Sequence, residues 1–136
     1  MPLIGGGGAG NTAGGNPVGT GTGLNYIGDH AYAYSGIAAS SPTPATVLNF
    51  STANQYIVAQ FQPIRTADST DNVQWLINFD GQTVSGVVVN SSRDSTPYEP
   101  LTLIIPAYTR VEVIQDNVSG GTDDCGFVVT GRIYYA

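Results

Sequence analysis

The sequence predicts an all-β protein: a single jelly-roll-like sandwich of two sheets and about eight strands, preceded by an extended glycine-rich N-terminal arm. Three observations lead to this fold class. Apolar and polar residues alternate with a period of two in several stretches, and turn residues separate these stretches about every ten residues. No stretch repeats its apolar residues at the helical period of 3.6.

The length of 136 residues fits one domain. We place the arm at residues 1–25 and the β-sandwich domain at residues 26–136. An immunoglobulin-like sandwich is the alternative architecture, although the Cys…Trp…Cys spacing of that family is missing.

The arm contains "IGGGGAGNTAGGNPVGTGTG" at residues 4–23, where ten of the twenty residues are glycine. Glycine loses more backbone entropy on ordering than any other residue, so this segment alone in water should be a flexible coil. We expect it to become ordered only against a neighbouring subunit. The residues expected to make this assembly contact are Leu3 and Ile4 as an anchor, followed by Gly5, Gly6, Gly7 and Gly8.

The first half of the domain supplies four strand predictions. Alanine and tyrosine alternate at residues 31–34, within the stretch 24–40. Further strands are expected within 43–51 and at 54–64. The clearest pattern lies at 73–80, where Val73, Trp75, Ile77 and Phe79 should face the core.

The second half begins with Asp80-Gly81, a strong signal for a tight hairpin, followed by a strand at 82–90. Pro100 and Pro106 flank the alternating stretch 101–105 and suggest an edge strand or strand ends. Strands at 109–116 and 125–136 complete the domain, the last with an expected bulge at Gly131.

Charge is scarce: only 10% of the residues are charged, there is no lysine, and the net charge is −6. Binding to a nucleic-acid backbone needs clustered Lys and Arg, so direct nucleic-acid binding is not expected. No apolar run has the length of a membrane span. Cys125 is the single cysteine, which excludes an intramolecular disulfide and fits a small buried side chain.

Catalytic and metal-binding patterns are weak. Asp29 and His30 are sequence neighbours in a predicted strand, so their side chains should point to opposite faces and cannot readily cooperate. We therefore expect no enzyme activity and no cofactor. Carboxylates cluster in two predicted loops, where ordinary turns are the simpler interpretation. The weak calcium candidates are Asp68, Asp71, Asp123 and Asp124.

Tyrosine is abundant, with eight in the chain, and its amphipathic ring suits interfaces and sugar-binding platforms. The interface candidates are Tyr26, Tyr32, Tyr34, Tyr134 and Tyr135. For a sugar platform, the candidates are Tyr32, Tyr34, Tyr98 or Tyr108.

Three runs, "YSGIAASSPTPATVLNFSTANQYIVAQFQPI", "TPYEPLTLIIPAYTRVEVI" and "DDCGFVVTGRIYY", resemble small jelly-roll virion proteins of the bacteriophage capsid decoration, or cement, type. The resemblance implies a non-enzymatic virion protein, made in the host cytoplasm. It would form a homotrimer and bind a major capsid protein or another virion protein. The alternative is a carbohydrate- or receptor-binding module of a phage tail or fibre.

Overall fold

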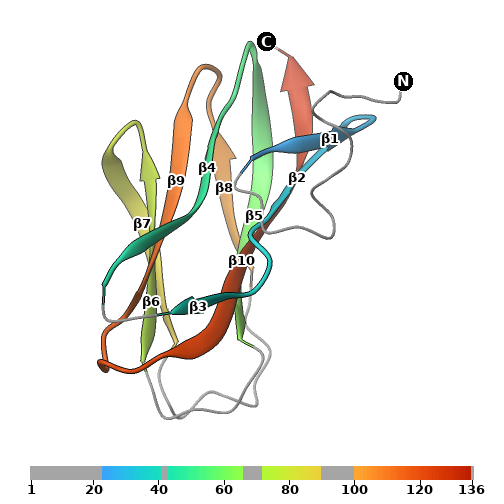
Figure 1. Ribbon diagram of the computed structural model, residues 1–136. Coiled ribbons are helices and arrows are strands. Elements are labelled where there is room, and N and C mark those ends of the chain that lie inside the picture. The colour runs from blue at the N-terminus through green and yellow to red at the C-terminus, as the bar shows by residue number, and fades with distance from the viewer. Residues whose placement is uncertain (1–22, 41–42, 66–71, 90–99, 136) are drawn as a thin grey trace.

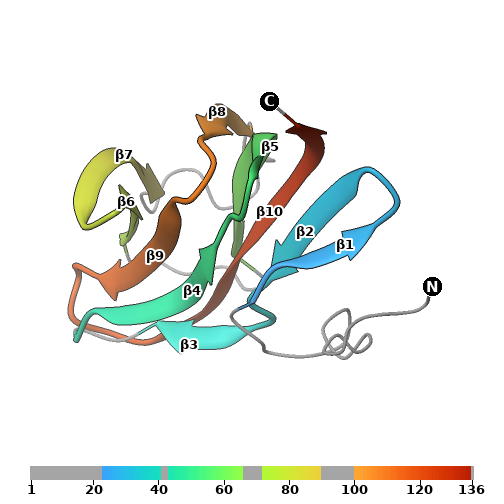
Figure 2. The same cartoon turned by 90° about the horizontal axis from the view of Figure 1, so that it is seen from above.

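The computed structural model describes residues 23–40, 43–65, 72–89 and 100–135. These residues form two antiparallel sheets that face each other, and no helix occurs among them (Figures 1 and 2). The predicted all-β sandwich is confirmed. The predictions for Leu3, Ile4 and Gly5 to Gly8 of the arm, and for Asp68, Asp71 and Tyr98, fall outside the described residues.

Sheet I has six strands: five lie in the order β1-β2-β10-β5-β8, and the sixth, β3, pairs with β10 beyond the end of β2. Its strands are β1 (Asn25–Ile27), β2 (His30–Tyr34), β3 (Ala38–Ser40), β5 (Gln55–Arg65), β8 (Leu101–Ile105) and β10 (Asp123–Tyr135). The predicted edge position of residues 101–105 is confirmed, because β5 is the one described strand that pairs with β8.

Sheet II has four strands in the order β4-β9-β6-β7. Its strands are β4 (Ala45–Ser51), β6 (Val73–Phe79), β7 (Gln82–Val89) and β9 (Arg110–Asn117). The hairpin between β6 and β7 turns at Asp80 and Gly81, which have φ values of 52° and 83°. Both residues take the left-handed conformation that a tight hairpin turn requires, so the Asp-Gly prediction is confirmed.

Strand pairing follows a nested pattern along the chain. β2 pairs with β10, β4 with β9, β5 with β8, and β6 with β7. Early strands therefore pair with late ones, as the two strands of one long hairpin would. Two further pairings, β10 with β5 and β9 with β6, roll this hairpin into the two sheets.

The core lies between the sheets and follows the predicted alternation. Val73, Trp75 and Ile77 of β6 are fully buried, whereas Phe79 is only partly buried and packs against the core. The rings of Trp75 and Phe127, from opposite sheets, lie 6.1 Å apart. Burial of each large apolar side chain contributes roughly 1.5–3 kcal/mol to folding, so this cluster is the main stabilising feature. Cys125 is buried, as expected.

Buried hydrogen bonds also join the two sheets. The indole N–H of Trp75 donates to Gln115 Oε1 at 2.8 Å, and Gln115 Nε2 donates to the carbonyl of Ala38 at 3.1 Å. Nearby, Asn117 Nδ2 donates to Ser40 Oγ at 3.3 Å. These polar side chains are satisfied inside the sandwich and link β9 of sheet II to β3 of sheet I.

The bulge predicted at Gly131 is wrong. β10 keeps an unbroken register with both β2 and β5 through this residue. Glycine is required there for a different reason: a Cβ atom would lie 2.6 Å from the carbonyl oxygen of Val58 and 2.6 Å from Ile57 Cγ2. The close approach of β5, rather than an extra residue, excludes a side chain at Gly131.

Candidate binding site

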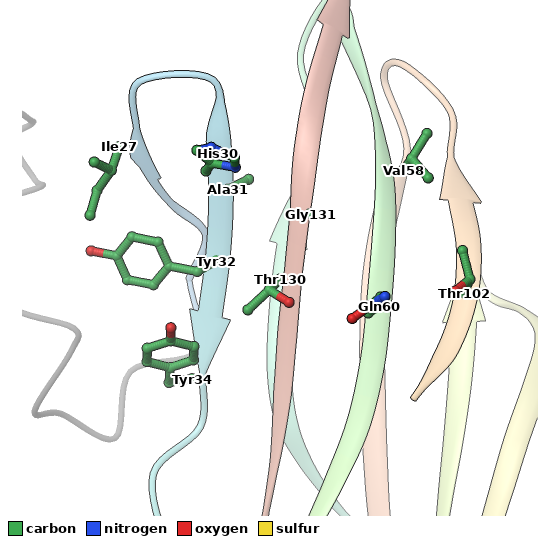
Figure 3. Close-up of a pocket in the computed structure, with 10 residues that line it drawn as sticks. All are labelled: Ile27, His30, Ala31, Tyr32, Tyr34, Val58, Gln60, Thr102, Thr130 and Gly131. Carbon is green, nitrogen blue, oxygen red and sulfur yellow. The ribbon is translucent and has the colours of Figure 1, made fainter. Parts of the chain in front are cut away.

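A shallow groove of about 520 Å³ lies on the outer face of sheet I (Figure 3). Its lining comes from β1, β2, β10, β5 and β8, so the whole width of the sheet contributes. The lining residues are Ile27, His30, Ala31, Tyr32, Tyr34, Val58, Gln60, Thr102, Thr130 and Gly131.

The sheet register places four of these residues in one row. Tyr32 pairs with Thr130, Thr130 with Gln60, and Gln60 with Thr102. Because directly paired residues project to the same side of a sheet, one phenol, two hydroxyls and one amide share the outer face. The row carries no charge.

Tyr32 and Tyr34 form one wall of the groove. They lie two residues apart on β2 and therefore on the same face, with ring centroids 5.0 Å apart and planes tilted by 42°. Both side chains are half-buried. This ring contact limits the rotamers of both tyrosines and leaves part of each ring accessible from the groove.

Among the described residues, the charged side chains nearest the groove lie beside His30. His30 is paired with Arg132, whose Nη2 lies 3.5 Å from the Asp29 carboxylate. The guanidinium also lies 5.9 Å from the centre of the Tyr134 ring. Asp29, the neighbour of His30, therefore contacts Arg132.

The remaining interface tyrosines lie farther along sheet I. Tyr134 is stacked on Tyr56 with ring centroids 5.4 Å apart, and Tyr135 at the end of β10 is 69% exposed. The Tyr26 hydroxyl accepts a hydrogen bond from Gln55 Nε2 at 3.1 Å. Burial raises the pKa of Tyr26 and the Tyr135 hydroxyl adds to this, whereas the Gln55 bond opposes it.

Tyr108 does not belong to the groove. It lies in the connection between β8 and β9, where it is 75% exposed and has a φ of 55°. The structure thus brings together Tyr32 and Tyr34 of the predicted sugar platform and separates Tyr108 from them.

The outer face of sheet II differs in chemistry. Leu76 of β6 lies directly opposite Ile114 of β9, and Gly86 of β7 lies on its other side. Val88 of β7 is 58% exposed. Glu112 and Asp116 of β9 share this face and flank the aliphatic patch. The sheet ends at β7, which pairs only with β6 among the described strands.

The backbone geometry shows which groups this edge presents. Val118 N–H donates to the carbonyl of Asn72, next to the first pair between β6 and β9. Bonded and non-bonded pairs alternate along an antiparallel ladder, so the backbone groups of Val73 and Trp75 point toward β7.

Val73 and Trp75 pair with Val89 and Val87 of β7. The intervening residues of β7 have the opposite orientation, so the backbone N–H and C=O groups of Gly86 and Val88 point away from β6. Among the described residues, no strand pairs with this edge.

Among the described residues, no group of three or more His, Cys, Asp or Glu side chains is arranged to hold a metal ion. Of the calcium candidates, Asp123 and Asp124 begin β10, and Asp124 is exposed. None of the described segments is a helix with the length and hydropathy of a membrane span.

No protein-family model matches the chain, and a search of curated proteins found no significant match.

Sequence reasoning missed Gln60, Thr102 and Thr130. The period-two pattern places Gln60 on the outward face of its strand. It does not show that Gln60 lies between Thr130 and Thr102, because these residues come from three strands that are distant in sequence. Only the order of the strands in the sheet places these three residues side by side.

Proposed function

We propose that this protein is a non-enzymatic structural component of a virus particle, either a capsid decoration protein or a minor capsid subunit. The nested strand pairing is the observation that carries this proposal. Pairing of the early strands with the late ones supports our interpretation of the sandwich as a jelly roll. Jelly rolls are a common architecture of viral capsid domains.

The edge strand β7 supports a role in assembly. Its sequence QTVSGVVV has neither a charge nor a proline, and it is eight residues long. Natural proteins usually protect exposed edges with charges, prolines, bulges or covering segments, because an open edge pairs with other chains. The bulge opposite Ile77 and Asn78 affects only the part of β7 near the turn.

The β8 edge of sheet I provides a contrast within the same molecule. β8 has five residues and is flanked by Pro100 and Pro106. Proline limits further pairing because it lacks a backbone donor. Of these two edges, β7 is therefore the better acceptor for an added strand.

We assign the occupant of the β7 edge to the N-terminal arm of a neighbouring copy. An added strand binds mainly through backbone hydrogen bonds, and the glycine-rich sequence allows close approach to another backbone. If each copy donates its arm to the next copy around a closed ring, the product is the expected homotrimer. Several arms acting together would also hold the oligomer on a capsid surface, because each contact raises the effective concentration of the next.

The test compares three variants with the full chain by sedimentation velocity and native mass spectrometry. Deletion of residues 2–23 and the substitution Val88→Pro should both yield monomers with an unchanged fold. Val88→Pro removes one backbone donor at the open edge and none from the β6 ladder. Val88→Thr is the matched control, because it keeps the donor, and it should remain oligomeric.

Binding to capsids of the corresponding virus gives the second readout. The truncated protein should fold normally and lose capsid decoration. Wild-type occupancy by the truncated protein would refute the arm mechanism, and absence of the protein from purified particles would refute the virion role.

A further inference from the structure

We infer that the groove on the outer face of sheet I binds a neutral oligosaccharide. The site is separate from the β7 edge and does not depend on the proposed arm exchange. It combines an aromatic wall with a row of uncharged hydrogen-bonding groups, and a sugar ring offers matching chemistry: C–H groups on its faces and hydroxyls at its edges.

The aromatic wall supplies the apolar contact. Tyr32 and Tyr34 are held together by their ring contact at 5.0 Å, and both line the groove (Figure 3). A preordered ring loses little conformational entropy when a ligand stacks on it. Tyrosine also retains a hydroxyl that can reach the hydroxyls of a sugar.

The polar row supplies the directional contacts. Thr130, Gln60 and Thr102 occupy adjacent strands, which are spaced roughly 4.8 Å apart. Their side chains have no hydrogen-bond partner among the described residues and face the groove, so their donors and acceptors are free for a ligand. A spacing of this size is comparable to one pyranose ring, so successive sugar units can lie across successive strands.

The charges favour a neutral ligand over an acidic one. The guanidinium of Arg132, at the His30 end, contacts the Asp29 carboxylate and the Tyr134 ring. The chain as a whole has a net charge of −6, which repels polyanions. An acidic saccharide would therefore find little attraction here.

The shape of the groove favours several sugar units rather than one. It crosses β2, β10, β5 and β8 and has a volume of about 520 Å³. Pockets for small molecules commonly have volumes of about 300–1,000 Å³ and a few polar groups that fix orientation. A shallow groove that crosses a sheet suits an internal stretch of an oligosaccharide chain.

The full-length protein is titrated with cellohexaose, xylohexaose and maltohexaose, with binding followed by NMR chemical shifts and calorimetry. A heparin-derived hexasaccharide and 3′-sialyllactose serve as acidic probes. At least one neutral hexasaccharide should bind with a Kd of about 0.1–1 mM and shift the resonances of Gln60, Thr102 and Thr130.

Variants of the groove then locate the site. Tyr32→Ala should weaken binding about tenfold, whereas Tyr32→Phe, which keeps the ring, should weaken it less. Gln60→Ala should weaken binding a few-fold, since it removes hydrogen bonds at an exposed position. Tyr108→Ala is the matched control because Tyr108 lies outside the groove, and it should bind like the wild type.

Four results would overturn the inference: no binding of any neutral hexasaccharide up to about 10 mM, binding of the acidic probes alone, equal affinities for all variants, or groove shifts on dilution without sugar. The last result would show that a second copy covers the face. None of these results depends on oligomerisation through the arm, so the two proposals can fail separately.

Discussion

The outer faces of the two sheets are built by the same strand periodicity and yet differ in chemistry. Sheet I presents tyrosines, threonines and a glutamine around a groove, whereas sheet II presents an aliphatic patch of Leu76, Ile114 and Val88 that is flanked by Glu112 and Asp116. Both faces lie over one shared core. The two faces therefore differ in side-chain chemistry: one combines aromatic and uncharged polar groups, and the other combines aliphatic and charged groups.

The two sheets also differ in how much space surrounds a glycine. Gly131 in sheet I lies against the β5 backbone, where a Cβ atom would be 2.6 Å from the nearest oxygen. At Gly86 in sheet II the corresponding distance is 3.1 Å. The first position has no room for a methyl group, and the second has nearly enough.

The largest expected effect tests this contrast. Gly131→Ala should lower the free energy of unfolding by about 2–3 kcal/mol, because β10 and β5 must separate to admit the methyl group. Gly86→Ala should change it by less than about 1 kcal/mol, since reduced entropy of the unfolded chain offsets the tighter contact. Urea unfolding of both variants measures the difference, and equal losses would contradict it.

The next prediction concerns the buried polar contact between the sheets. Gln115→Leu should cost about 2 kcal/mol, because the Trp75 indole N–H and the Ala38 carbonyl lose their partner inside the core. Gln74→Leu, on the partly exposed outer side of sheet II, is the matched control and should be nearly neutral. Urea unfolding again gives the values. An unchanged free energy of unfolding for Gln115→Leu would contradict this prediction.

A smaller effect compares the ring contacts of sheet I with the aliphatic contacts of sheet II. A double-mutant cycle to alanine at Tyr56 and Tyr134 should give a coupling of about 1 kcal/mol. The same cycle at Leu76 and Ile114 should give about 0.5 kcal/mol. A larger coupling energy for Leu76 and Ile114 than for Tyr56 and Tyr134 would contradict this prediction.

The smallest effect is restricted to high pH. Burial raises the pKa of Tyr26 in the folded state above its unfolded value of about 10. The folded state then holds this proton more tightly than the unfolded state, so stability is lost as the pH rises above about 10. Tyr26→Phe should reduce this alkaline loss while leaving the stability at pH 7 nearly unchanged. Thermal unfolding from pH 8 to 11 measures the profile, and an unaltered slope would refute the assignment.

Much of the fold could be predicted from local patterns. Alternation identified the buried face of β6, the Asp80-Gly81 dipeptide identified a hairpin, and the prolines around 101–105 identified an edge. Each depends on the chemistry of a few adjacent residues. The predicted bulge at Gly131 failed because a glycine in a strand has two explanations, and only the position of β5 distinguishes them.

The site was less predictable than the fold. Tyr32 and Tyr34 were found because they alternate within one strand, but the sequence could not tell whether they belonged with Tyr108 or with Thr130 and Gln60.

By itself, the sequence determined most of the strands, their inward and outward residues and the scarcity of charge, because these properties are local or additive. It predicts about eight strands, whereas the described residues form ten, because the stretch 24–40 contains the three short strands β1, β2 and β3. The tertiary structure decided the order of strands in each sheet, and with it which outward residues became neighbours. A row such as Tyr32, Thr130, Gln60 and Thr102 exists only because pairing between distant strands fixes its register. That register depends on the burial of the whole core and not on any one segment.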